Sequence, residues 1–167
     1  MKKLITAMLM LTMLSNVSYS QDASLSESLD WVKGKLEAFK YSRYGTVGIN
    51  YWDKYTYTMS FTECELKITQ KYSYVEDAPW SRNDYTRETV YVFSLSELKS
   101  IDYDANADAF IIKTYNDKKV IVADDTRIEN EFRIRVTDLG DLKGQPERFL
   151  KAFRHAMNLC GAKKEAF

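Results

Sequence analysis

The segment YTYTMSFTECELKI, residues 55–68, decides the fold, because its apolar positions change parity at one point. Before Thr62 the apolar side chains stand at odd positions, and after Glu63 they stand at even positions. A two-residue hairpin loop at Thr62-Glu63 explains the change, since it keeps all of these side chains on one face of the sheet. Thr-Glu is poor turn chemistry because neither residue favours a positive φ, so a β-bulge is the alternative. The apolar register favours the hairpin, which pairs Phe61 with Cys64, Met59 with Leu66 and Tyr57 with Ile68.

The alternation continues beyond this hairpin and predicts about seven strands. The pattern changes from helical to alternating at Thr46, and the first of these strands ends at Phe61. Ser94–Glu97 is expected to form a single helical turn between two strands. The other expected strands are residues 64–68, 86–95, a strand beginning at Ile101, and residues 109–115, 120–123 and 132–136.

One helix is expected before the strands and one after them. The segment Ser24–Glu27 is a capping box, and an apolar stripe of about four turns follows it. Pro146 suits the first turn of the last helix, and Gly161 is the expected residue after its end. The fold class is therefore α+β: an antiparallel sheet or open barrel with an N-terminal helix and a C-terminal packing helix.

The first twenty residues have the pattern of a cleaved export signal. Two lysines precede the apolar run Leu4–Leu14, and Ser18–Ser20 supplies small residues at the −3 and −1 positions of a cleavage site. The apolar run is shorter than the ~20 residues that span a bilayer. We therefore expect residues 1–20 to be removed and residues 21–167 to form a single domain, periplasmic or secreted, with no stable membrane insertion.

Composition narrows the possible partners. Of the 24 basic side chains, Lys2 and Lys3 leave with the signal, so 22 remain against 24 acidic side chains. A nearly neutral mixture argues against nucleic acid, which requires a basic surface to release counterions. It also argues against electrostatic docking on anionic lipid.

Cys64 and Cys160 are the two cysteines, and both stand at positions that face the core. An oxidising compartment favours a disulfide between them, which would join the first hairpin to the last helix. Closing so long a loop would stabilise the fold by about 4–5 kcal/mol in the chain-entropy model. Two buried thiols that pack as small apolar residues are the alternative.

Aromatic residues crowd into the first two strands and the segment before them. Some of these rings must be exposed on alternating strands, where they can stack on sugars, lipids or peptide side chains. Trp52, Tyr55 and Trp80 are therefore the candidates for a ligand-binding site; alternatively, the rings only fill half-exposed strands. The expected function is an exported, non-catalytic binding or interaction module for a peptide, a glycan or an apolar ligand, without a cofactor.

Two other functions stay open. A structural subunit would pair with another chain through a sheet edge. An envelope hydrolase, or its accessory protein, would use carboxylates at turns. The candidates for that chemistry are Asp102, Asp104, Asp124 and Asp125. No metal site is expected: the segment Asp102–Asp108 has the oxygen spacing of a calcium loop, but Ala107 and Lys113 replace its Gly and Glu.

Asp30-Trp31, Phe61-x-x-Cys64, Phe93–Leu98 and the final helix Glu147–Gly161 follow the leader in this order. Together they resemble a group of small exported proteins of Gram-negative bacteria that has no assigned function. The resemblance covers nearly all of the mature chain and implies export, but it transfers no catalytic residue. Strands followed by a final helix also resemble the pleckstrin-homology-like superfold, which implies a bent antiparallel barrel and no single function. The basic residues that hold phosphoinositides in that superfold are not matched, since the first hairpin carries Lys67 and little else positive.

Overall fold

The computed structural model describes residues 23–47, 49–76, 84–115, 121–124, 127–142 and 145–162. The expected export signal, Trp80 and Asp125 lie outside the described residues.

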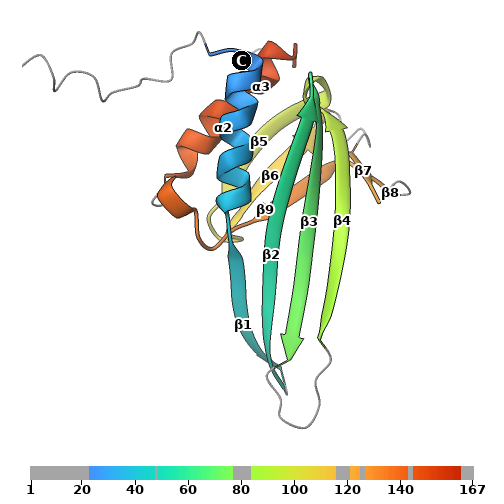
Figure 1. Ribbon diagram of the computed structural model, residues 1–167, viewed down its shortest axis with the longest axis vertical. Coiled ribbons are helices and arrows are strands. Elements are labelled where there is room, and N and C mark those ends of the chain that lie inside the picture. The colour runs from blue at the N-terminus through green and yellow to red at the C-terminus, as the bar shows by residue number, and fades with distance from the viewer. Residues whose placement is uncertain are drawn as a thin grey trace, which may run out of the picture.

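Two helices pack against each other at one end of the molecule, and antiparallel strands curve away from them (Figure 1). The larger sheet has six strands in the order β1-β2-β3-β4-β7-β8, and the smaller has the order β5-β6-β9. The fold is therefore α+β and antiparallel, as expected. In chain order the helices and strands are α2 (Leu25–Ala38), β1 (Tyr41–Val47), β2 (Ile49–Thr62), β3 (Glu65–Glu76), β4 (Tyr85–Ser94), the 3-10 turn η1 (Leu95–Glu97), β5 (Leu98–Asp104), β6 (Ala109–Thr114), β7 (Ile121–Ala123), β8 (Arg127–Glu129), β9 (Glu131–Arg135), the 3-10 turn η3 (Gly140–Leu142) and α3 (Pro146–Leu159).

The described residues form nine strands, where about seven were expected. The two additional strands, β1 and β8, are the edges of the larger sheet. An edge strand has a neighbour on one side only and buries fewer side chains, so its alternation of apolar and polar residues is weak. The sequence pattern therefore predicts a segment that leads into the next strand, and does not predict β1 as a strand of its own.

The predicted register of the first hairpin was wrong by two residues. The loop is Glu63-Cys64, so Phe61 pairs with Leu66 and Met59 with Ile68. Glu63 adopts a φ of 51°, which the first residue of a tight hairpin loop requires. A loop at Thr62-Glu63 would place a β-branched residue in that left-handed conformation, at a higher steric cost. The shift moves Cys64 into the loop, but it is even, so every apolar side chain that stays in the two strands keeps the face that the sequence predicted.

The two helices begin as their sequences indicate. The Ser24 side chain accepts the backbone N–H of Glu27, and the Glu27 carboxylate accepts the backbone N–H of Ser24 at 2.8 Å, which completes the capping box. Pro146 occupies the first turn of α3. Both helices pack on a core that also includes both sheets, and the ring of Phe39, the residue that follows α2, meets rings of β6 and α3 there. The centroid of Phe149 lies 5.0 Å from that of Phe39 and 4.7 Å from that of Phe110.

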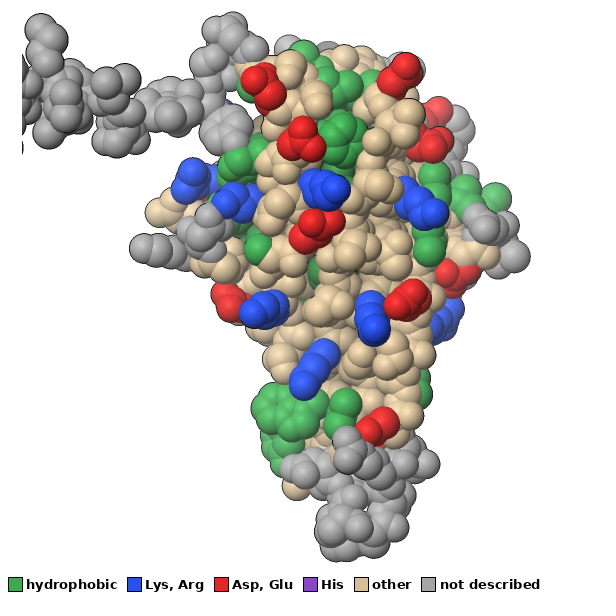
Figure 2. Space-filling view, in the orientation of Figure 1, with side chains coloured by type: hydrophobic (Ala, Val, Ile, Leu, Met, Phe, Trp, Pro, Cys, Tyr) green, Lys and Arg blue, Asp and Glu red, His purple; other side chains and the backbone are tan. Residues whose placement is uncertain are grey.

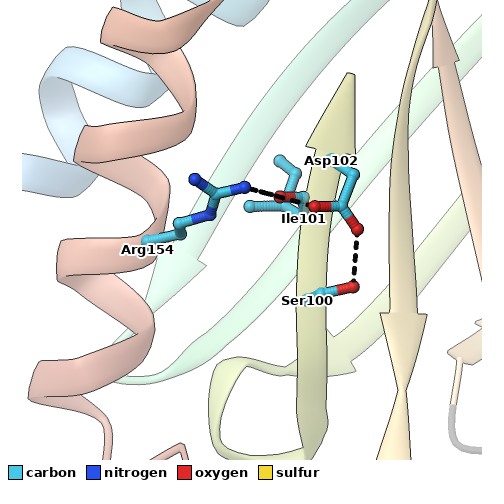
Figure 3. A network of polar contacts seen from close by, with 4 residues as sticks. All are labelled: Ser100, Ile101, Asp102 and Arg154. Atoms are coloured by element: carbon cyan, nitrogen blue, oxygen red, sulfur yellow. Dashed lines mark hydrogen bonds and ion pairs between the residues drawn. The ribbon is translucent and has the colours of Figure 1, made fainter. Parts of the chain in front are cut away.

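The expected disulfide between Cys64 and Cys160 is confirmed, with 5.7 Å between the two Cα atoms. It joins the turn between β2 and β3 to the end of α3. A polar network makes a second connection between α3 and the strands (Figure 3). Arg154 donates to the Ile101 carbonyl at 2.7 Å and to the Asp102 carboxylate at 3.2 Å. In the part of the chain that the structure describes, no helix combines the length and the apolar character needed to cross a membrane.

Candidate ligand-binding pocket

Strand β9 crosses the inner face of the larger sheet, which is the face that carries the buried side chains Tyr57, Met59 and Ile68. The hydroxyl of Tyr57 in β2 bonds to the backbone of Arg135 in β9. At the other side of the crossing, the ring of Tyr91 in β4 lies 4.1 Å from that of Phe132 in β9. Strands β1–β4 continue well past this crossing, as Figure 1 shows. The continuing part of the inner face is where the candidate site lies.

Tyrosines cover this part of the inner face in an unbroken series across four strands, which we call the tyrosine ladder. Cross-strand neighbours stand close enough for ring contacts in a twisted antiparallel sheet. The centroid distances are 5.2 Å for Tyr41–Tyr55, 4.9 Å for Tyr55–Tyr72, 5.6 Å for Tyr72–Tyr85, 5.4 Å for Tyr85–Tyr74 and 5.3 Å for Tyr74–Tyr51. The tyrosine ladder therefore forms a continuous aromatic surface beside β9.

A pocket of about 410 Å³ lies between the tyrosine ladder and the edge of β9. The residues that line the pocket belong to strands of both sheets, so both sheets fix the geometry of the pocket. The lining combines aromatic rings with charged and neutral polar side chains: Tyr55, Gln70, Tyr72, Arg87, Thr89, Tyr91, Glu129, Glu131, Phe132, Arg133 and Arg135. A volume of this size falls within the range of small-molecule sites.

The three arginines of the pocket differ in their partners. Arg87 pairs with Asp124 at 3.3 Å, and Arg133 pairs with Glu131 at 2.5 Å. Arg135 instead places its guanidinium carbon 5.9 Å from the ring centroid of Tyr55, and among the described residues it has no carboxylate partner. The pocket therefore holds one positive charge that the described carboxylates do not pair.

The hydroxyls of Tyr55 and Tyr72 remain protonated at neutral pH, because the pKa of each is raised. Burial is the main cause that raises the pKa of Tyr55, and the nearby Arg135 guanidinium opposes that shift. Burial also raises the pKa of Tyr72, which donates its hydroxyl hydrogen to Asp53 at 2.5 Å. These groups offer hydrogen bonds and ring faces to a ligand, and they are not acids at neutral pH.

Of the three predicted ligand-binding residues, Tyr55 lines the pocket. Trp52 lies on the opposite, outer face of β2, is 39% exposed, and contacts Tyr44 with 5.0 Å between ring centroids. Figure 2 shows a group of hydrophobic side chains over this part of β1 and β2. The structure therefore does not bring Trp52 and Tyr55 together, because residues three apart on a strand face opposite ways.

The described carboxylates proposed for hydrolysis have separate hydrogen-bond partners, and none of them lines the pocket. Asp102 binds Arg154, and Asp104 accepts the backbone N–H groups of its own turn at Asn106 and Ala107. Asp124 accepts the N–H of Val90 at 3.1 Å and so holds β7 on β4. Within the described ranges, no group of three or more His, Cys, Asp or Glu side chains is placed to bind a metal.

The charged half of the pocket could not be predicted from the sequence. Arg133 and Arg135 alternate with the apolar residues of the expected strand 132–136, a pattern that indicates only a solvent-facing side, and no pattern in the sequence distinguishes Arg87. Their shared position depends on where β9 crosses the larger sheet, and a strand pattern carries no information about that crossing.

Comparisons with protein-family models, with curated proteins and with solved structures found no match to this chain.

Proposed function

We propose that this protein is an exported, non-catalytic binding module that holds its ligand in the pocket between the tyrosine ladder and β9. One observation carries the proposal: strands of two different sheets contribute rings and charges to a single pocket of about 410 Å³. Rigid strands hold such side chains in place before the ligand arrives, which lowers the entropic cost of binding.

The lining favours a polar ligand with a flat or apolar face. A purely apolar ligand would remove water from Arg135, Gln70 and Thr89 without replacing the lost hydrogen bonds. A glycan or a peptide has both the hydrogen-bonding groups and the faces that stack on tyrosine. Of the ligand classes predicted from the sequence, these two are therefore the ones we propose.

Export and the finer fold belong to the same proposal. The sequence of residues 1–20 supports export, and the disulfide between Cys64 and Cys160 suits an oxidising compartment such as the periplasm. A pleckstrin-homology-like arrangement is supported by α3, which follows the last strand and packs against the core with Phe149 and Phe153.

Native mass spectrometry of the mature protein purified from the periplasm tests the proposal. We expect a mass above that calculated for residues 21–167, because a ligand is retained. Gln70→Trp should fill the pocket and abolish the added mass. Thr69→Trp is the matched control, since it adds the same ring at the next position of β3, on the outer face. An adduct that both variants retain equally would place the ligand elsewhere.

A sheet edge supports a second candidate function, that of a structural subunit. On the outer edge of β1, the backbone of Lys40 bonds to Asp138, and Ser42 donates to Thr137 at 3.1 Å. By strand alternation, the backbone groups of Tyr44 and Thr46 point the same way, and among the described residues they have no partner on that side. Such groups can pair with another chain. Sedimentation velocity over a wide concentration range tests this function, and a monomer throughout would exclude self-pairing.

A further inference from the structure

We infer that the ligand of this pocket carries a single carboxylate beside a ring or apolar group, with Arg135 binding the carboxylate and Tyr55 contacting the adjoining group. This inference rests on the proposed function, because it names the chemical class that the same pocket selects.

The charge of Arg135 favours an anionic ligand. Its guanidinium lines the pocket next to the Tyr55 ring, in a half-buried position, and no described carboxylate pairs with it. A partly desolvated guanidinium gains most from an anion that accepts two parallel hydrogen bonds. The other two arginines of the pocket, Arg87 and Arg133, already have carboxylate partners in Asp124 and Glu131.

The backbone of Arg135 is held in a fixed position. The hydroxyl of Tyr57 bonds to both the N–H and the carbonyl of Arg135, at 2.7 Å and 3.1 Å. The backbone that carries the guanidinium is therefore anchored to β2, the strand that also carries Tyr55. A ring and a charge on anchored strands keep a constant spacing, and that spacing selects a ligand with a ring or apolar group next to its anion.

The charges of the lining favour a ligand with a single negative charge. Arg87 and Arg133 are already paired with Asp124 and Glu131, so Arg135 is the one arginine of the lining that is left for an anion. A phosphate monoester carries about −1.5 to −2 at pH 7, and Glu129 and Glu131 would repel the additional charge. A carboxylate has a single charge and matches the planar guanidinium.

Binding of matched probe pairs to the disulfide-bonded protein, residues 21–167, tests the inference. N-acetyl-tyrosine and N-acetyl-tyrosinamide differ in the carboxylate alone and represent the end of a peptide. Glucuronic acid and glucose make the corresponding pair for a sugar. Calorimetry or NMR titration should show that at least one acid binds about tenfold or more tightly than its neutral partner, as a charge-assisted hydrogen bond predicts. The pair that shows the preference identifies the source of the carboxylate.

Three variants locate the effect. Arg135→Gln should abolish the preference for the acid, and Arg135→Lys should restore part of it, because lysine keeps the charge and loses the bidentate geometry. Arg148→Gln is the control, since it removes one positive charge from the exposed surface of α3 and should leave the preference unchanged. Circular dichroism melting of each variant confirms that it is folded.

The outcomes separate the two proposals. Equal binding of acid and neutral probes, no binding of either acid, or an unchanged preference in Arg135→Gln would each overturn the carboxylate inference. Tighter binding of phenyl phosphate than of phenylacetate would also overturn it. In each case the proposed function would still stand if native mass spectrometry shows an adduct that Gln70→Trp abolishes. Loss of the carboxylate preference and of the adduct together would reject both proposals.

Discussion

The hydroxyl of Tyr57 bonds in both directions to the peptide backbone of Arg135, 78 residues further along the chain. It donates to the carbonyl oxygen at 3.1 Å and accepts the amide N–H at 2.7 Å. Tyr57 is 3% exposed, so this link between β2 and β9 is shielded from water. It sets the point at which β9 crosses the larger sheet, and therefore the position of the wall of the pocket.

Removing this hydroxyl should destabilise the fold without changing its shape. Tyr57→Phe keeps the ring and leaves a backbone N–H and a carbonyl of Arg135 without their partner, at a cost of about 1–3 kcal/mol. Urea unfolding followed by circular dichroism measures the change in the free energy of unfolding. Tyr44→Phe is the control, because Tyr44 is 44% exposed and its variant should stay within about 0.5 kcal/mol of the wild type. Equal stabilities for the two variants would mean that the Tyr57–Arg135 link contributes nothing.

Stability should fall in alkaline solution. Burial raises the pKa of Tyr57 above the ordinary value near 10, so the unfolded chain loses this proton at a lower pH than the folded protein does. Above pH ~10 the unfolded state therefore binds fewer protons, and the free energy of unfolding decreases as pH rises, by up to about 1.4 kcal/mol per pH unit for this group. Urea unfolding at several pH values measures the slope. Tyr57→Phe should have a shallower slope, and an identical slope would assign the effect to other tyrosines.

Reduction should destabilise the protein strongly. In the chain-entropy model, a disulfide that closes a loop of about 100 residues contributes roughly 4.7 kcal/mol, which is a large part of the stability of a domain. The urea midpoint should fall on adding dithiothreitol. A variant with both Cys64→Ser and Cys160→Ser should unfold at the lowered midpoint with or without the reductant. If the urea midpoint of the wild-type protein is the same with and without dithiothreitol, the disulfide is absent in solution.

Two glycines provide a matched pair of substitutions. A Cβ at Gly34 would contact nothing within 4 Å, so Gly34→Ala should stabilise α2 by about 0.8–1 kcal/mol. A Cβ at Gly45 would come within 2.8 Å of three atoms of the Tyr51 side chain, and so would displace that ring from its contact with Tyr74. Gly45→Ala should therefore fail to stabilise the protein, and NMR should show shifted ring resonances for both tyrosines. Unshifted ring resonances would contradict the packing of Tyr51 over Gly45.

The network between α3 and β5 should show unequal effects when its two charges are removed. Asp102→Ala removes one exposed ion pair and the exposed hydrogen bond from Ser100, for which together we expect at most about 0.5 kcal/mol. Arg154→Ala also removes the bond to the Ile101 carbonyl, so it should cost about 1 kcal/mol. Thermal unfolding of the two variants gives the comparison. A larger effect of the aspartate variant would contradict the role of that carbonyl.

Local sequence signals predicted the local structure well. The capping box at Ser24, the helical turn at Leu95–Glu97 and the apolar face of α3 each depend on residues close together in the chain, and all three are confirmed. The disulfide was also predicted, because the expected export favoured a bond between the two cysteines over two buried thiols.

Features that depend on distant segments were predicted poorly. The hairpin register was wrong because two registers that differ by two residues bury the same side chains, and the conformation of Glu63 distinguishes them. The pocket was missed except for Tyr55, since its charges belong to strands that meet only after β9 crosses the sheet. A charged residue on the polar face of a strand has the same sequence pattern whether it faces bulk water or a pocket shared with another strand.

The disulfide also makes the chain between its two cysteines a covalent ring. Cys64 and Cys160 are 96 positions apart, and β3 to β9 and the whole of α3 lie between them. Arg87, Arg133 and Arg135 belong to this ring, whereas Tyr55 lies on the tail that precedes it. A protease that cuts the ring once would open it without releasing a fragment. A nicked molecule would thus run as a single species on a non-reducing gel and separate into two pieces only after reduction.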